Sequence, residues 1–509
     1  MGITSFLFLL LFTVSVILYY SIPKRCQWPF LLVISVFYFL MSGSAILILY
    51  PLTSITVTYF GAKRIEQEKD HKKRKRGLSL VVICNLGILI VLKYLNLGVY
   101  TYNALASRLA DSPVLLDTLC FLIPLGVSFY TLSILSYVFD VYYEIGSAEK
   151  NWAKLFLFGM YFPTIISGPI MRYKDMREQM FGTHVFDYSQ VTRGIQRILW
   201  GFFKVLVISE RLAIVVSTVY DDYETYGGFY IVFATLCFSL QLYSNFSGSM
   251  DIVIGVSQVY GITLPENFQT PFLSKTIQEF WRRWHITLGG WLKDYIFYPV
   301  LRTDFFMELP GKLKPRFGKK TAKKITTFSA MFILWFAVGL WHGGSWKYII
   351  GSGMIPWIYI VGGELLEPLW VKLRALFRVD KDTKWFSVFQ MIRTFLLMSF
   401  AFLFFNSNGF FSALSMIGNI LTTWNPWILW DGSLLQLGLE LKEWIILILS
   451  LTLLWIVSVM QQKGSVREWL ANRNIVVRWM LLYALLFWVI LMGNYGPGYS
   501  AAEFIYQGF

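Results

Sequence analysis

Two of the four histidines stand where an imidazole could do chemistry. His285 and His342 each follow a tryptophan, Trp284 and Trp341, and each lies in or beside a strongly apolar segment. An ionisable side chain at membrane depth is costly and is by default a functional candidate. The alternative is a core histidine whose ring bonds to a backbone carbonyl. Because the ordinary pKa of imidazole lies near neutrality, a neutral ring could take a proton from an attacking hydroxyl.

The surroundings of the histidines separate them into two pairs. His342 ends the apolar run 325–341 and is followed by Gly343-Gly344-Ser345, a helix break that could open a cavity at membrane depth. His71 and His184 lie in polar segments, and we expect both at the surface.

Charged and aromatic side chains are densest around His285. Within 16 positions the chain carries Glu279, Arg282, Arg283, His285, Lys293 and Asp294, interleaved with Phe280, Trp281, Trp284, Trp291 and Tyr295. One interpretation is an interfacial amphipathic helix with snorkelling arginines. The other is a re-entrant segment whose cations Arg282, Arg283 and Lys293 bind an anionic cofactor such as a pyrophosphate, with Asp294 in support.

A third polar segment interrupts the apolar run 228–260. It reads Tyr243 to Asp251 and contains Ser247 among other small residues. Asp251 should be either paired or near a water-filled path, and we expect Asp251 and Ser247 to support the site. The small residues could equally allow close packing of helices.

The composition requires a membrane. Of the 509 residues, 56% are hydrophobic and only 15% are charged, against roughly 25% in ordinary globular chains. Repeated apolar runs long enough to span a bilayer predict an all-α, polytopic protein with about 11–14 membrane helices plus re-entrant or interfacial helices. Soluble enzymes, disulfide scaffolds and disordered chains are excluded. The four cysteines lack metal-type spacing and are expected to be packing residues, so no metal is predicted.

The net charge of +15 reflects orientation rather than nucleic-acid binding. Residues 60–77 and 302–324 each hold eight Lys or Arg, the segments 171–197, 372–384 and 463–478 are also basic, and 406–440 has none. The positive-inside rule places the basic segments in the cytoplasm. One last span at about 479–492 then puts the C-terminal tail, 494–509, outside. No repeat period or linker divides residues 1–509, so one membrane domain is expected.

These motifs together resemble the membrane-bound O-acyltransferase (MBOAT) family, in its bacterial branch of alginate and peptidoglycan O-acetyltransferases. The segments that carry the resemblance are Glu279–Leu288, Trp291–Tyr295, Trp341-His342-Gly343, Pro124–Phe129, Ser167-Gly168-Pro169 and Phe246–Ile252. It is best over about residues 100–350.

The resemblance implies tilted helices around a central funnel in a bacterial inner membrane. It assigns catalysis to His342 and His285, beside Trp341 and Trp284 as donor- or substrate-binding candidates. It implies an acyl donor, most naturally acetyl-CoA, on the cytoplasmic side and a glycan acceptor outside. Because the two are separated, a secreted or periplasmic acetyltransferase partner of the SGNH-hydrolase type is expected.

The C-terminus reads Glu503-Phe504-Ile505-Tyr506-Gln507-Gly508-Phe509. It is similar to the terminal aromatic motif of transferases in this group and of a small teichoic-acid partner peptide. Because a phenyl ester is more activated than an alkyl ester, Tyr506 is a candidate acyl carrier. The alternative is an interfacial aromatic anchor.

Two other functions fit the same residues. One is D-alanyl transfer to teichoic acid, against which the length of the chain and its own tyrosine tail both weigh. The other is a transporter or flippase of an acylated intermediate, because Asp251, His285 and His342 would suit it. Many transporter folds contain an inverted repeat of broken helices. The sequence shows no such repeat, which weighs against the transporter alternative.

Overall fold

The computed structural model describes residues 1–109 and 114–496. All regular secondary structure in these ranges is helical, and one isolated β-bridge joins Phe268 to Trp284. Nine helices there are long and apolar enough to cross a membrane, and shorter apolar helices occur at Phe6–Ser21, Val127–Tyr142 and Phe410–Thr422. The predicted all-α, polytopic membrane fold is confirmed.

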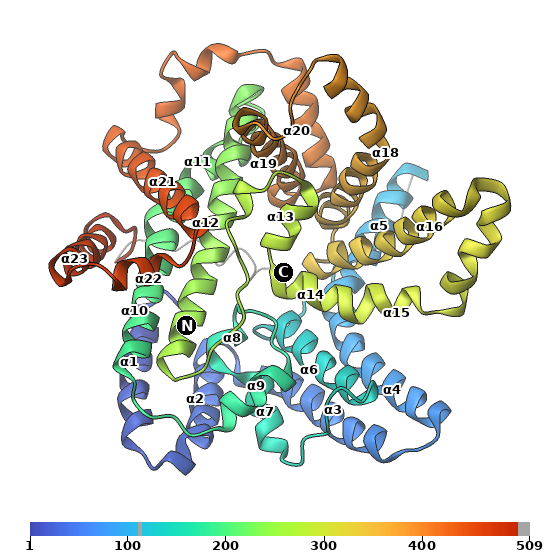
Figure 1. The fold of residues 1–509 in the computed structure, drawn as a ribbon, viewed down its shortest axis with the longest axis vertical. Coiled ribbons are helices and arrows are strands. Elements are labelled where there is room, and N and C mark those ends of the chain that lie inside the picture. The colour runs from blue at the N-terminus through green and yellow to red at the C-terminus, as the bar shows by residue number, and fades with distance from the viewer. Residues whose placement is uncertain (110–113, 497–509) are drawn as a thin grey trace.

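Most helices follow one another along the chain with short connections, and longer stretches precede α13 and α21 (Figure 1). In the first half they are α1 (Phe6–Ser21), α2 (Gln27–Ser42), α3 (Leu49–Gln67), α4 (His71–Leu89), α5 (Leu95–Leu109), α6 (Val127–Tyr142), α7 (Trp152–Met160), α8 (Phe162–Ile165), α9 (Tyr173–Phe181), α10 (Tyr188–Phe202), α11 (Glu210–Tyr220) and α12 (Phe229–Val259). In the second half they are α13 (Ile277–Arg283), α14 (Ile286–Leu292), α15 (Tyr298–Leu301), α16 (Asp304–His342), α17 (Trp346–Tyr348), α18 (Ile355–Leu376), α19 (Lys384–Asn406), α20 (Phe410–Thr422), α21 (Leu441–Gln461), α22 (Val466–Ala471) and α23 (Ile475–Met492).

Shorter helical segments of other pitch join or extend these helices. The π-helical segments are η3 (Ile90–Tyr94), η4 (Phe203–Ser209), η6 (Lys293–Phe297) and η7 (Ile349–Met354). The 3-10 segments are η1 (Lys24–Cys26), η2 (Ala45–Ile48), η5 (Pro271–Leu273), η8 (Pro426–Leu429) and η9 (Ser433–Gln436). π-Helical turns concentrate at functional sites, and η3 becomes important below.

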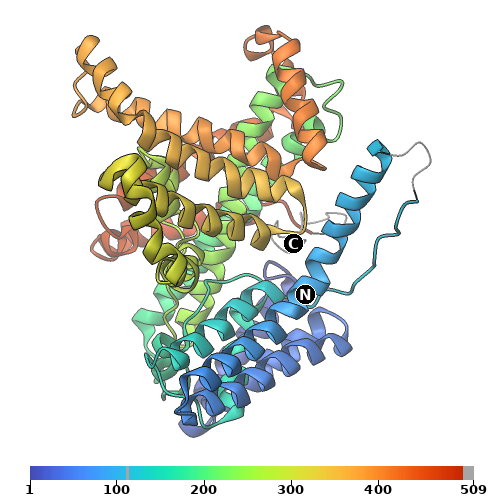
Figure 2. The ribbon, with the colours of Figure 1, turned by 90° about the vertical axis from the view of Figure 1, so that its right-hand side faces the viewer.

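Two predicted features of the N-terminal half have different outcomes. The long apolar run 28–59 breaks after Ser42 into α2 and α3, as the Ser-Gly-Ser sequence indicates, and both helices pack on α7. The apolar run 114–139 is only partly helical, because α6 begins at Val127 and residues 114–124 are extended. Asn96 and Asn103 of α5 each exchange two hydrogen bonds with the extended backbone at 2.8–2.9 Å. This segment runs beside α5 in Figure 2.

The basic segment 302–324 is mostly helical and does not form an irregular loop between membrane helices. Helix α16 begins at Asp304 and continues to His342, with a kink at Gly318, where φ is +74°. Helix α16 thus carries a basic, proline-containing first part and an apolar second part. Its C-terminal end delivers His342 to the interior of the protein.

The pair α10 and α12 packs at glycine positions. A Cβ atom on Gly201 would stand 2.6 Å from the carbonyl oxygen of Gly248, and one on Gly194 would stand 2.8 Å from that of Gly255. Only glycines allow the two backbones to approach this closely. The small residues around Ser247 therefore serve helix packing, as the second interpretation of that segment proposed.

A network of buried charges lies along the same helix pair. Asp251 of α12 pairs with Lys204 at 2.6 Å and with Arg197 at 2.9 Å. Arg197 also forms a bidentate pair with Glu266, and the Lys204 ammonium donates to Ser247 Oγ at 2.9 Å. Asp251 is thus paired, and Ser247 belongs to its network. Together they hold α10 and η4 against α12.

The predictions for His184 and for the cysteines need correction. His184 is half-buried, and its Nδ1 lies 2.7 Å from the hydroxyl oxygen of Tyr19, so it ties the polar loop after α9 to α1. Of the four cysteines, which are all free thiols, Cys26, Cys84 and Cys120 are exposed and only Cys237 is buried. Their role as packing residues therefore holds for Cys237 alone.

Candidate active site

A strained turn between α13 and α14 places His285. Thr276 caps α13, and its hydroxyl accepts a hydrogen bond from the backbone N–H of Glu279 at 3.1 Å. The helix ends at Arg283, and the next residue, Trp284, pairs as a β-bridge with Phe268. His285 then has a φ of +48°, a left-handed conformation that is rare for residues other than glycine. Such strain persists where surrounding contacts enforce it, often at functional sites.

Asn267 supplies those contacts. Its backbone oxygen accepts from the N–H of Ile286 at 3.0 Å, and its side-chain Oδ1 accepts from the N–H and hydroxyl of Thr287 at 3.1 and 2.9 Å. His285 Nδ1 lies 3.2 Å from the same Oδ1. Since the backbone N–H of Thr287 can only donate, the Asn267 atom that it meets must be oxygen. His285 is therefore protonated at Nδ1 and carries its ring lone pair at Nε2.

His342 reaches the same region from the end of α16. The helix stops at Gly343, and the turn Gly343–Ser345 runs against η3, where a Cβ atom on Gly344 would stand 1.9 Å from the carbonyl oxygen of Lys93. The hydroxyl of Tyr94 donates to the carbonyl of Leu340 at 2.7 Å. These contacts fix the end of α16 against η3.

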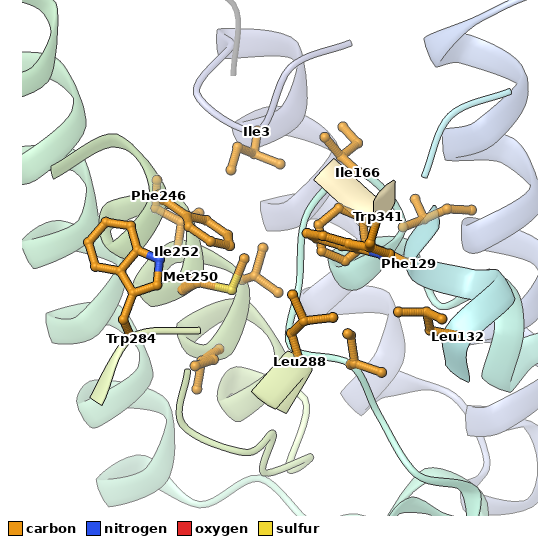
Figure 3. Packing of buried hydrophobic residues seen from close by; sticks show 14 of the residues in the cluster. Ile3, Phe129, Leu132, Ile166, Phe246, Met250, Ile252, Trp284, Leu288 and Trp341 are labelled. Carbon is orange, nitrogen blue, oxygen red and sulfur yellow. The ribbon is translucent and has the colours of Figure 1, made fainter. Parts of the chain in front are cut away.

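Trp341 stands between the two histidines. Its ring centroid lies 5.2 Å from that of His285 and 5.0 Å from that of His342, and both contacts are edge-on. Phe129 packs on Trp341 at 5.7 Å, and Phe246 packs on His285 at 4.9 Å. Figure 3 shows Trp341 close to Phe129 and Ile166, with Phe246 and Trp284 farther across the core. Both histidines are buried, so the predicted pair forms one centre, which we call the His–Trp–His centre.

A cavity of about 200 Å³ reaches this centre from one side. His342 and Trp341 line it, together with Lys93 of η3, Phe129 of α6 and the segment Ser42–Gly43 after α2. It lies at the opposite end of α3 from the basic segment 60–77, because α3 begins at Leu49 and ends at Gln67.

A second, polar cavity of about 540 Å³ lies next to the bridge between Phe268 and Trp284, since the adjacent residues Gln269 and Arg283 line it. The residues that line it include Thr270, Lys275, Glu279, Arg283, Gln461 and Gln462. Arg283 pairs with Glu279 at 2.7 Å and donates to the Thr270 hydroxyl at 3.1 Å. Its volume falls in the range of sites for small-molecule ligands and cofactors. Since Gln461 and Gln462 directly precede the basic segment 463–478, this cavity lies at the basic side of the helices.

The remaining predicted residues divide among three surroundings. Arg282 and Lys293 are exposed, whereas Asp294 pairs with Arg172 at 2.6 Å. Trp284 is buried in an aromatic cluster and stacks on Phe280 at 5.4 Å. Tyr506 lies outside the described residues. The last described residues follow α23, where the N–H of Asn494 donates to the carbonyl of Leu206 in η4 at 3.0 Å.

Sequence reasoning missed Asn267 and Arg172. Each stands in a motif that was noted for other reasons: Asn267 follows Glu266 in the run before His285, and Arg172 follows the Gly-Pro break at 168–169. Their partners lie 18 and 122 positions away, so spacing gave no signal. Within residues 1–109 and 114–496, no three His, Cys, Asp or Glu side chains gather as a metal site would require.

Replacing Asn267 with leucine should lower the turnover of the enzyme ~10-fold to 100-fold, as loss of a residue that orients a catalytic ligand does elsewhere. The lost Oδ1 frees the His285 ring to adopt the wrong tautomer. Asn267→Asp keeps an oxygen acceptor at Nδ1 and should retain most of the rate. Initial rates with both variants test this, and equal rates for Asn267→Leu and wild type would show that Asn267 only shapes the turn.

Comparisons with known proteins found one matching family and several similar proteins. Residues 108–309 match the membrane-bound O-acyltransferase family. A probable alginate O-acetylase of Pseudomonas putida is 30% identical over 454 residues, which cover 89% of this chain and 86% of the relative. A peptidoglycan O-acetyltransferase of Helicobacter pylori is 26% identical over 72% of this chain and 68% of the relative. A teichoic acid D-alanyltransferase of Bacillus subtilis is 27% identical over 56% and 69%.

The matched range contains Asn267, His285 and the bridge between them, and the alignment with the first relative covers most of the remaining chain. The fold brings its two buried histidines together, and the similarity to the first relative extends over most of both chains. The chain belongs to the membrane-bound O-acyltransferase family.

Proposed function

We propose that this O-acyltransferase moves an acetyl group from cytoplasmic acetyl-CoA across the membrane, for O-acetylation of a cell-surface polysaccharide. The observation that carries the proposal is the buried His–Trp–His centre, which one cavity reaches at His342, while Arg283, two positions before His285, lines a second, polar cavity. Such an arrangement gives a donor and an acceptor separate approaches to one reacting group.

Charge supports the orientation of the two cavities. The polar cavity lies at the basic side, which the positive-inside rule places in the cytoplasm, where CoA is found. Arg283 and Lys275 line it, and the exposed Arg282 and Lys293 lie on the same segment of chain. These cations suit the phosphates of CoA. The smaller cavity then faces outward, in a bacterial inner membrane.

The chemistry follows from the two histidines. The imidazole of His342 takes the proton of the acceptor hydroxyl, whose oxygen attacks the thioester carbonyl. The C–S bond breaks, and the CoA thiolate takes up the proton, which leaves an ester and free CoA. His285, with its lone pair at Nε2, is oriented by Asn267 to accept a hydrogen bond from the acceptor hydroxyl and so to hold it in place.

The small outer cavity also limits the acceptor. A cavity of about 200 Å³ holds a side chain or an acetyl group and is too small to enclose a polysaccharide chain. We therefore propose Tyr506 as an acyl carrier and an extracytoplasmic SGNH-hydrolase-like acetyltransferase as the partner that finishes the reaction. α23 begins within the basic segment 463–478 and rises ~27 Å at 1.5 Å per residue, so its C-terminal end lies on the outer side. The names of the alginate and peptidoglycan relatives favour a glycan acceptor.

D-alanyl transfer to teichoic acid is the second candidate, because one relative carries that name. The two donors separate them. The purified enzyme is incubated with acetyl-CoA or with a D-alanyl carrier protein, and release of the free thiol is measured. Release from acetyl-CoA alone supports the proposal, and release from the D-alanyl carrier alone contradicts it.

Arg283→Gln should raise the KM for acetyl-CoA ~10- to 100-fold with little change in kcat, as expected for loss of one charge-assisted contact of about 1.5–3 kcal/mol to the donor. Arg316→Gln is the matched control, since Arg316 is exposed on the kinked first part of α16. Steady-state CoA release measures both variants. An unchanged KM in Arg283→Gln would remove the polar cavity from donor binding.

A further inference from the structure

A buried lysine faces the outer cavity. Lys93 is 8% exposed and lies in η3, a π-helical turn inside an apolar helix. Its ammonium group makes no hydrogen bond or ion pair with the part of the chain that the structure describes. A buried charge in an apolar helix is expensive unless something compensates it. The fold therefore retains a costly cation at this place.

Contacts of the neighbouring backbone hold Lys93 beside the His–Trp–His centre. Lys93 and His342 line the same cavity, together with Trp341. The neighbouring Tyr94 is bonded to the carbonyl of Leu340, and the carbonyl of Lys93 closely abuts Gly344. The residues on either side of His342 are thus both anchored to η3, which fixes the position of Lys93 relative to the imidazole.

We propose that the Lys93 ammonium binds the acyl carbonyl oxygen in this cavity and stabilises the oxyanion that forms there during transfer. The inference rests on the proposed function, because it requires an acyl thioester at the His–Trp–His centre. The ligand class is a small acyl group, since about 200 Å³ is below the range for larger ligands.

The step balances in atoms and charge. The acceptor oxygen forms a bond to the carbonyl carbon as His342 takes its proton, and the carbonyl electron pair moves onto oxygen beside Lys93. When the electron pair returns, the C–S bond breaks and the thiolate receives the proton from His342. The oxyanion lies between two cations, the lysine and the imidazolium, so it offsets their mutual repulsion.

Preorganised cations and dipoles of this kind contribute strongly in a site without water. Removing one oxyanion donor typically lowers kcat ~10²- to 10³-fold. Lys93→Met keeps the length of the side chain and removes its charge. We therefore expect this loss in kcat with KM for acetyl-CoA nearly unchanged, because the donor phosphates bind in the other cavity.

The matched control is Lys347→Met. Lys347 is a partly buried lysine near the same helix end, but its ammonium donates to the carbonyl of Ser407 at 2.6 Å and does not line the cavity. Both variants remove the charge of one lysine, so both should destabilise the fold to a similar extent. Only Lys93→Met should lower kcat strongly. Thermal unfolding in detergent checks that both are folded.

A chemical rescue separates charge from packing. Lys93→Cys is alkylated with 2-bromoethylamine, which rebuilds a lysine-like ammonium side chain, and wild type treated in the same way controls for the native cysteines. Recovery of CoA release by at least ~10-fold supports the proposal, as one restored charge contact should. A Lys93→Met enzyme as fast as Lys347→Met would overturn it, and so would failure of the rescue in a folded protein. Absence of CoA release from wild type would contradict the proposed function and this inference together, whereas release from wild type and Lys93→Met alike contradicts this inference alone.

Discussion

Replacing His342 with alanine is expected to lower CoA release from acetyl-CoA ~10²- to 10⁴-fold, the usual contribution of a general base. His342 is buried, lines the outer cavity and contacts Trp341 at 5.0 Å. Without the imidazole, an acceptor hydroxyl in that cavity has no base for its proton. Initial rates of thiol release measure the effect, and His71→Ala is the control, since His71 lies at the exposed start of α4.

The effect should not add to that of His285. Because both rings contact Trp341, we expect them to act on one substrate, and residues that act as a unit are strongly non-additive. The double variant His285→Ala/His342→Ala should therefore be little slower than the slower single variant. Rates that multiply would mean two independent sites. A His342→Ala enzyme with the rate of His71→Ala would remove His342 from the chemistry.

Replacing Asp251 with alanine should destabilise the protein by about 3–5 kcal/mol, the cost of removing one partner from a buried ion pair. Lys204 is 3% exposed and would lose its carboxylate, while Arg197 would keep only Glu266. The α10–α12 contact beneath the site would then carry an uncompensated cation. The thermal unfolding midpoint in detergent measures the loss.

The matched variant is Asp251→Leu/Lys204→Met. It removes both charges of the closest pair and leaves Arg197 bonded to Glu266, so much of the lost stability should return. Exposed pairs contribute little, and Glu308→Ala, which breaks the exposed pair with Lys312, should leave the midpoint nearly unchanged. Equal midpoints for Asp251→Ala and Glu308→Ala would show that the buried network does not stabilise the fold.

The sequence predicted the fold class because apolar runs of sufficient length have one structural solution in a bilayer. It also predicted the helix break at Ser42–Ser44, where small residues interrupt an apolar run. It failed where tertiary contacts decide the backbone. Nothing in the apolar residues 114–124 shows that two asparagines of α5 will hold them extended.

The sequence likewise predicted part of the site, namely its two histidines, but not the residues that surround them. His285 and His342 were found because a rare ionisable residue in an apolar segment is informative by itself. Lys93 carries the same signal as a lone charge within the apolar run 78–98, but its chain position does not show that it shares a cavity with His342. The role of Asn267 depends on a bridge between segments that pattern alone could not align. The pairing of Asp294 with Arg172 likewise required the folded chain.

The central claim is that an acyl group passes through the His–Trp–His centre to a carrier on the same chain. Mass spectrometry of the purified protein after incubation with acetyl-CoA tests it most directly, with wild type beside His342→Ala and Tyr506→Phe. We predict one added acetyl group on the C-terminal peptide of the wild type and none in either variant. The same acetyl adduct in His342→Ala as in wild type would contradict the account.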